Sequence, residues 1–443
     1  MTENVQTKIH QLSKNWADQM AYYRLINNKK VSTDAIISGF TKSTSEKIEP
    51  VHYLCFQDTT QSNLESNRGH ISPNSGLGVI ADNQSLGFYL HPSLVIKASN
   101  ESCIGFSFIK TYTHPEGGAN RHERKYNSLP IEEKESYRWI ESVQQTSKTL
   151  SNASMITHIQ DREGDIFQLL ATHTTKDHFI IRSTYNRKIR YNGEICDLYE
   201  TLASSPLRDT YQLAIRGDIR KNTINRQAIM ELRYIEVEVQ PPLKLSRRVP
   251  LSPIKVVAIE AKESPSTVPD GQEPIHWRIL TTHQIKDFSD ACQIVYWYSL
   301  RWHIETLFRL LKTQGFDIEN IELENGESII KMTLFALWAS LKVMALLLSS
   351  KTIFPNQNQL VNELFTENEI ECLKALNVKL SGNTQKLKNP YPDTALSWAF
   401  WVVARLGGWK GYNSQRPPGV IILYKGIKKL ELILIGYDLQ RCV

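Results

Sequence analysis

The chain has 443 residues, of which 41% are hydrophobic and 22% are charged, which is the composition of an ordinary soluble globular protein with room for two or three domains. A net charge of +6 permits a nucleic-acid partner without demonstrating one. The six cysteines are scattered without a Cys-x-x-Cys pair, and the N-terminus lacks the apolar run of a signal peptide. These features argue against a zinc site and a disulfide framework, and we expect a cytoplasmic protein.

The N-terminal region is predicted to be helical. We expect one helix over Ile9–Ile26 and a second over Ser32–Gly39, with Ser32 or Thr33 as N-cap and Gly39 as the C-terminal stop. The basic turn at residues 27–30 could touch a phosphate backbone or be a solvated loop.

The first core strand is expected at residues 51–56, followed at once by Asp58. An acid at the carboxyl end of a buried strand lies at the edge where ligands bind in many α/β sheets. The commoner alternative is an Asx-turn, in which the side chain caps the next backbone amides. Two further strands are expected over 87–96 and 103–109, followed by a polar loop and a helix over 131–140.

A second acid follows a second strand. Residues 155–159 form an apolar run that leads into Asp161-Arg-Glu-Gly-Asp165 and a short helix over 166–171. Asp161 could be a ligand or could cap that helix, and Asp165 could favour the positive N-terminal end of the helix. A further strand is expected over 179–183.

Residues 184–273 change to short alternating segments broken by prolines, which predicts a β-rich insertion. Much of the basic excess lies here. The cations are Arg187, Lys188, Arg190, Arg216, Arg220, Lys221, Arg226, Arg233, Lys244, Arg247 and Arg248.

After a core strand at 277–282, we expect one continuous helix over residues 287–312. At 3.6 residues per turn one face carries a phenol, a carboxylate and three cations within about 80°. These are Tyr298, Arg301, Glu305, Arg309 and Lys312. The face could be a solvated one, stabilised by ion pairs worth about 0.2–0.5 kcal/mol each. Alternatively, Glu305 holds a divalent metal while Arg301 and Lys312 grip phosphate oxygens. The apolar segment 332–348, which contains Lys342, is expected to be a buried helix rather than a membrane span.

Two strand–Asp units and a helix–Glu unit make up the arrangement of a ribonuclease H-like site. The spacing of Tyr298, Arg301, Glu305 and Lys312 resembles the Tyr-x2-Arg-x3-Glu-x6-Lys signature of bacterial DDE transposases of the insertion-sequence-four family. Other segments are also similar to that family's pattern. They are Gln57-Asp58-Thr-Thr, Asp161-Arg-Glu-Gly-Asp165, Arg182, Trp277, and a tail with Ala404-Arg-Leu-Gly-Gly408, Pro418-Gly419 and Lys425-Gly426.

The resemblance implies an α/β protein with a ribonuclease H-like catalytic core, interrupted by the β-rich insertion and flanked by helical regions. The implied domains are a remnant helical DNA-binding region (1–45), the core (46–183 and 274–325), the insertion (184–273) and a C-terminal dimerisation region (326–443). It also implies cut-and-paste transposition, in which Asp58, Asp161 and Glu305 hold two Mg²⁺ or Mn²⁺ ions and catalyse DNA cleavage and joining. Implied DNA contacts come from Tyr298, Arg301, Arg309, Lys312, Arg182 and Trp277, the last stacking on a flipped base.

The implied partners are the terminal inverted repeats and the target DNA, bound by a homodimer near the nucleoid and away from membranes. In that family a longer helical domain is expected before the first strand, whereas 57 residues stand before Asp58 here. We therefore expect weak, salt-dependent DNA binding with little preference for the terminal repeats. Two alternatives stay open: a truncated regulator that inhibits a full-length transposase by dimerisation, and a domesticated nuclease that does not transpose.

Overall fold

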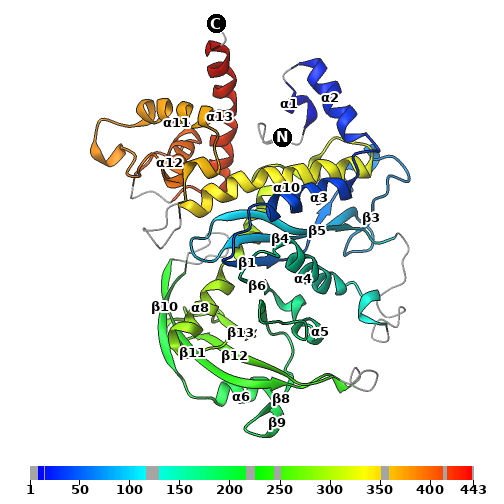
Figure 1. Cartoon of the computed structure of the whole chain (residues 1–443), viewed down its shortest axis with the longest axis vertical. Helices are drawn as coiled ribbons and strands as arrows, with labels where there is room; N and C mark the ends of the chain where they lie inside the picture. Colours follow the sequence, from blue (N-terminus) through cyan, green and yellow to red (C-terminus); the bar gives the residue numbers. More distant parts are fainter. Residues whose placement is uncertain are drawn as a thin grey trace.

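The structure is a computed structural model that describes residues 8–13, 15–115, 129–215, 225–243, 251–350, 359–412 and 417–441. Its described strands join into one 13-stranded mixed sheet (Figure 1), whose main path runs β2-β4-β1-β6-β7-β13-β12-β11-β8-β9. The strands are β1 (His52–Gln57), β2 (Thr60–Asn63), β3 (Gly78–Val79), β4 (Leu86–Lys97), β5 (Cys103–Tyr112), β6 (Met155–Gln160), β7 (Asp177–Arg182), β8 (Lys188–Tyr191), β9 (Glu194–Asp197), β10 (Asp209–Ile215), β11 (Arg226–Val239), β12 (Ile254–Glu263) and β13 (His276–Thr281). The mixed α/β class expected from the sequence is confirmed.

Parallel pairing is concentrated at the centre of the sheet, where β6 lies between β1 and β7 and is parallel to both. The carboxyl ends of these three strands therefore meet at one edge. The strands of residues 184–273 continue the same sheet, because β12 pairs with β13 and β13 pairs with β7.

The sheet separates two hydrophobic cores, as the alternation along β7 shows: Ile180 belongs to one cluster, and Phe179 and Ile181 belong to the other. The first core contains side chains from α3, α8, α9 and α10, and the second contains side chains from α4, α5 and α6. The helices are α1 (Ile9–Leu12), α2 (Trp16–Ile26), α3 (Thr33–Ser45), α4 (Tyr137–Thr149), α5 (Phe167–Leu170), α6 (Leu198–Ser204), α8 (Phe288–Ser299), α9 (Trp302–Leu311), α10 (Gly326–Ser349), α11 (Glu367–Leu380), α12 (Leu396–Leu406) and α13 (Val420–Arg441).

The N-terminal helices differ from the prediction in two places. The segment expected as one helix is divided into α1 and α2, and Asn15 caps α2 by accepting from the Asp18 amide. Ser32 is the N-cap of α3, as predicted, but Gly39 does not end that helix. Tertiary contacts carry α3 onward, since the ring of Phe40 stacks on Trp338 at 4.5 Å and the buried Thr44 hydroxyl accepts from the Phe106 amide at 3.0 Å.

The continuous helix predicted over residues 287–312 is also wrong: α8 ends at Ser299 and α9 begins at Trp302. Between them the backbone tightens, because the amides of Arg301 and Ile304 bond to carbonyls three residues back, at 3.0 and 3.1 Å. Tyr298 and Glu305 therefore lie on different helices. The predicted helix over 131–140 also starts later, with a single 3₁₀ turn at Ile131–Glu133 and α4 beginning at Tyr137.

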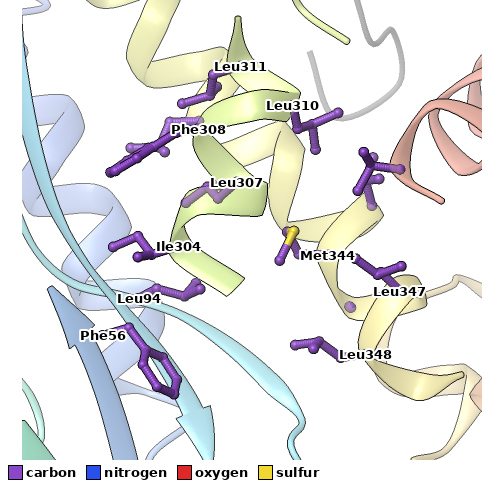
Figure 2. Packing of buried hydrophobic residues seen from close by; sticks show 14 of the residues in the cluster. Phe56, Leu94, Ile304, Leu307, Phe308, Leu310, Leu311, Met344, Leu347 and Leu348 are labelled. Atoms are coloured by element: carbon purple, nitrogen blue, oxygen red, sulfur yellow. The ribbon is translucent and has the colours of Figure 1, made fainter. Parts of the chain in front are cut away.

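Helix α9 is anchored on two sides (Figure 2). Ile304 and Leu307 lie towards Phe56 of β1 and Leu94 of β4, while Leu310 lies on the side of α10. Helix α10 crosses the molecule as its longest apolar element (Figure 1) and would be long enough to span a membrane. However, 78% of its most apolar window is buried inside the fold, as in the core helix of a soluble protein.

Candidate active site

Asp58 and Asp161 leave the sheet side by side. Phe56 of β1 is paired with Ile159 of β6, and each aspartate lies two residues beyond its member of that pair. Short backbone contacts fix both carboxylates: Asp58 Oδ1 accepts from the Thr59 amide at 2.8 Å, and Asp161 Oδ1 accepts from the Glu163 amide at 2.9 Å. Asp161 thereby caps a 3₁₀ turn at Arg162–Gly164. Asp161 thus caps this turn and not the helix expected over 166–171, while Asp58 binds the amide of the next residue. Oδ2 of each aspartate lies outside these two contacts.

Arg301 joins the first strand to α9. Its Nη1 donates to Asp58 Oδ2 at 3.0 Å, and its Nη2 donates to Glu305 Oε1. The side chains of Asp58 and Arg301 are 18% and 13% exposed, so this pair is largely shielded from water. Burial lowers the pKa of Arg301, but the charges of Tyr298, Asp58, Glu305 and Asp161 outweigh that effect and raise the pKa. Arg301 therefore binds two of the three acids expected to act together, and the charge of the third, Asp161, also acts on it.

The electrostatic strain of this site falls on Asp58, whose pKa is raised to about 7. Burial is the largest cause, followed by the negative charge of Asp161, and Arg301 offsets part of both. A smaller contribution comes from Glu305. The Asp58 carboxyl group is therefore partly protonated near pH 7, and additional positive charge nearby would favour its ionised form.

The donor chemistry of this cluster fits a hard divalent cation, since carboxylate oxygens are the ligands that Mg²⁺ and Mn²⁺ prefer. Within the described ranges, no three His, Cys, Asp or Glu side chains lie close enough together to hold a metal ion as they stand. Arg301 lies between two of the acids and satisfies them instead.

Tyr298, Arg182 and Trp277 lie together next to Arg301. Burial raises the pKa of the Tyr298 phenol, and the nearby charges of Arg301 and Arg182 lower it in part. The Trp277 ring, on β13, is partly exposed and meets the Tyr298 ring edge to face at 5.7 Å between centroids. Three of the residues expected to contact DNA thus form one aromatic and cationic group.

The other two cations expected to contact DNA lie further along α9. Arg309 is exposed and donates to the Thr306 hydroxyl at 3.0 Å. Lys312 comes directly after α9, with its Nζ 3.4 Å from Glu319 Oε1. Neither side chain lies among the contacts of Asp58.

The basic insertion is more neutral than its composition suggests. Each of its predicted cations that the structure describes is paired with a carboxylate. The pairs are Arg187–Asp165, Lys188–Asp197, Arg190–Glu238, Arg226–Glu263 and Arg233–Glu231. The remaining cations, at 216, 220, 221, 244, 247 and 248, lie outside the described residues. Asp165 does not act on a helix end: its buried carboxylate binds Arg187 and the amides of Thr184 and Tyr185.

Sequence reasoning missed Arg138, a buried residue of α4. Its Nε donates to the Thr59 hydroxyl at 3.0 Å, and its Nη2 donates to Glu163 at 2.5 Å. No spacing rule predicts these contacts, because Thr59 and Arg138 are 79 residues apart along the chain.

Residues 166–341 match the sequence model of a family described as "Transposase DDE domain". The matched segment contains Arg182, Trp277, Tyr298, Arg301, Glu305 and Lys312, and it begins after Asp161. The similarity indicates a domain of the transposase class, which acts on DNA and generally depends on a divalent metal.

Proposed function

We propose that this protein is a transposase of the insertion-sequence-four type, which cuts and joins DNA at the ends of an insertion sequence. The observation that carries the proposal is the bridging of Asp58 and Glu305 by Arg301 at the carboxyl edge of two parallel strands, where the charge of Asp161 also acts on Asp58. The match to a transposase domain over residues 166–341 supports it independently. The fold proposed for the core is ribonuclease H-like, with the three acids contributed by β1, β6 and α9.

In this proposal Asp58, Asp161 and Glu305 hold two Mg²⁺ or Mn²⁺ ions. When bound, the ions would activate a water or 3′-hydroxyl nucleophile and stabilise the leaving oxygen. Once Arg301 no longer bridges Asp58 and Glu305, its planar fork is free to bind a phosphate of the cut strand. Tyr298 and Arg182 lie beside it and would orient the same strand, while Trp277 would stack on a displaced base.

The test is cleavage of a duplex that carries the inverted repeats flanking the reading frame. Purified protein should nick this duplex only when Mg²⁺ or Mn²⁺ is added. Asp58→Asn, Asp161→Asn and Glu305→Gln should each reduce nicking by at least about a thousandfold while DNA binding persists, because each removes a metal-holding charge. As a matched control we choose Glu322→Gln, which alters an exposed acid that binds Lys8 and should leave nicking intact.

The same assay separates the enzyme from the regulator that the sequence leaves open. A regulator would bind DNA or a transposase partner without nicking at any metal concentration. If the purified protein does not cleave a terminal-repeat substrate that already carries a nick, the enzymatic proposal is contradicted.

A further inference from the structure

Arg138 stands in an unfavourable place for a buried cation. It is the second residue of α4, where free backbone N–H groups already concentrate positive charge. The residue is only 8% exposed, and its guanidinium lies over the Trp139 and Tyr112 rings at 5.6 and 5.9 Å. Burial of a positive charge at a helix N-terminus destabilises the fold unless hydrogen-bond or ion-pair partners compensate for it. The partners of Arg138 therefore indicate its role.

Two of those partners come from the loops that carry the aspartates, and the third is Glu135, whose carboxylate accepts from Nη1 at 3.3 Å. Nε donates to Thr59 Oγ1 at 3.0 Å, and Nη2 donates to Glu163 Oε2 at 2.5 Å. Nη1 donates to the Glu135 carbonyl at 3.0 Å, which ties the guanidinium to the start of its own helix. One planar group thus spans the loop after β1 and the loop after β6.

The same two residues hold the aspartates through their backbones. The Thr59 amide donates to Asp58 Oδ1, and the Glu163 amide donates to Asp161 Oδ1. Each aspartate is therefore one backbone hydrogen bond away from a residue whose side chain Arg138 grips. The link is the same on both sides, although β1 and β6 are separated by almost a hundred residues of chain.

The Thr59 hydroxyl is fixed by this contact. Arginine can only donate, so Thr59 Oγ1 accepts from Arg138 Nε, and the same hydroxyl shares a hydrogen bond with His91 Nδ1 of β4 at 2.8 Å. Burial, followed by the charge of Arg138, lowers the pKa of His91 well below its usual value. The Thr59 hydroxyl is therefore held between side chains of α4 and β4, which restrains the loop that carries Asp58.

We propose that Arg138 is a positioning residue that sets the separation of the Asp58 and Asp161 carboxylates for divalent-cation binding. The inference rests on the proposed function and adds to it a residue of α4 that touches neither DNA nor cation. Partners of this kind, one step behind the ligands, typically change metal affinity 10–100-fold when they are replaced.

The experiment measures Mn²⁺ binding by calorimetry, together with the Mg²⁺ concentration for half-maximal nicking. Arg138→Gln should weaken Mn²⁺ binding by about tenfold or more and raise the half-maximal Mg²⁺ concentration by a similar factor. DNA affinity without metal should not change. Arg138→Lys should recover part of the loss, because a lysine keeps the charge but cannot span both loops.

Two further variants guard against a trivial loss of folding. Glu163→Gln alters an exposed side chain (61%) and keeps its backbone bond to Asp161, so it should weaken Mn²⁺ binding in the same direction but less than Arg138→Gln. Lys176→Met is the matched control, since Lys176 donates to the Leu150 and Ser151 carbonyls beyond the other end of α4. It should bind Mn²⁺ like the wild type.

The outcomes are distinguishable. If the wild type binds Mn²⁺ and nicks DNA, while Arg138→Gln matches the wild type or Lys176→Met loses as much as Arg138→Gln, the positioning role is wrong and the proposed function stands. If the wild type neither binds Mn²⁺ nor nicks DNA, the proposed function fails and this inference fails with it. A tenfold loss confined to Arg138 and its partners supports the proposal.

Discussion

Asp58 and Arg301 form the central ion pair of the candidate site. The guanidinium donates to Asp58 at 3.0 Å and also binds Glu305, so the acids are compensated without a metal. The compensation is incomplete, because the pKa of Asp58 is still raised to about 7 by burial and by the charge of Asp161. In the proposed function, a cation bound by the acids would take over this compensation from Arg301.

Asp58 should govern how the stability of the metal-free protein depends on pH. Its pKa is near 3.8 in the unfolded chain and about 7 in the fold, so the folded state binds the proton more tightly. Its contribution to stability is therefore full below about pH 4 and is lost as the pH rises through 7. We compare the free energy of unfolding of Asp58→Asn with that of the wild type in buffer that contains a metal chelator. The difference in favour of the variant should grow as the pH rises from 4.5 to 7, reach about 2–4 kcal/mol, and stay constant at higher pH. Thermal unfolding at each pH measures the difference, and a constant offset would contradict this assignment.

Trp277 could be a core aromatic or a ring that stacks on DNA, and kinetics can separate these two roles. A core aromatic would affect stability, whereas a ring that stacks on a flipped base would affect the step that needs the flip. Because the ring is partly exposed beside Tyr298, Trp277→Ala should slow the step that displaces a base at the cut end more than it slows first-strand nicking. Trp277→Phe should keep part of the activity. Equal loss of both steps with a lower melting temperature would favour the core role.

Among the elements, the strands were predicted from the sequence more closely than the helices. Apolar runs located β1, β6, β7 and β13 to within two residues, since buried strands carry a continuous signal. The two breaks in the predicted helices, after Leu12 and Ser299, were missed because the segments contain no Gly or Pro there. Gly39 was misread for the opposite reason: packing of Phe40 and Thr44 overrides its weak helix propensity. Arg138 could not be found, because its role depends on contacts between distant loops.

The attachment of α2 to α10 depends on a buried lysine. Lys331 is 1% exposed, and its Nζ donates to the Ile26 and Asn28 carbonyls at 3.2 and 3.1 Å, at the C-terminal end of α2. Lys331→Met should remove these two hydrogen bonds and the ion pair with Glu327 at 2.8 Å, and so loosen α2 at a cost of about 1–3 kcal/mol. Hydrogen exchange should then accelerate in residues 16–26 but not in β1 or β6.

The matched control is on the same helix. Lys342→Met breaks an ion pair with Glu369 of α11 and should leave exchange in α2 unchanged. Equal acceleration in both variants, or in neither, would show that Lys331 is not what holds α2 in place.

For the whole molecule, the sheet continues from β7 through β13 into β12 and β11, so the residues predicted as an insertion are fused to the core by backbone pairing. The domain boundaries drawn from the sequence stay a prediction. The composition of this region gives the number of cations but not their ion-pair partners. Buried Asp165, for example, forms an ion pair with Arg187.

This pairing has a consequence for DNA binding. A cation that already has a carboxylate partner releases few counterions when it meets a phosphate. Arg190→Gln, whose partner is Glu238, should therefore change the salt dependence of duplex binding by much less than one unit of slope. Exposed Arg309, which donates to a hydroxyl, should change it by about one unit when replaced by Gln. Binding isotherms at four salt concentrations measure both slopes, and a larger change for Arg190 would contradict this prediction.

The most direct test is to locate Mn²⁺ by anomalous scattering in crystals of the protein soaked in that ion. We expect anomalous peaks among the carboxylates of Asp58, Asp161 and Glu305, with the Arg301 guanidinium displaced from its bridge between Asp58 and Glu305. The peaks should disappear in Asp161→Asn. A fully occupied Mn²⁺ site elsewhere, with Arg301 still bound to Asp58 and Glu305, would contradict it.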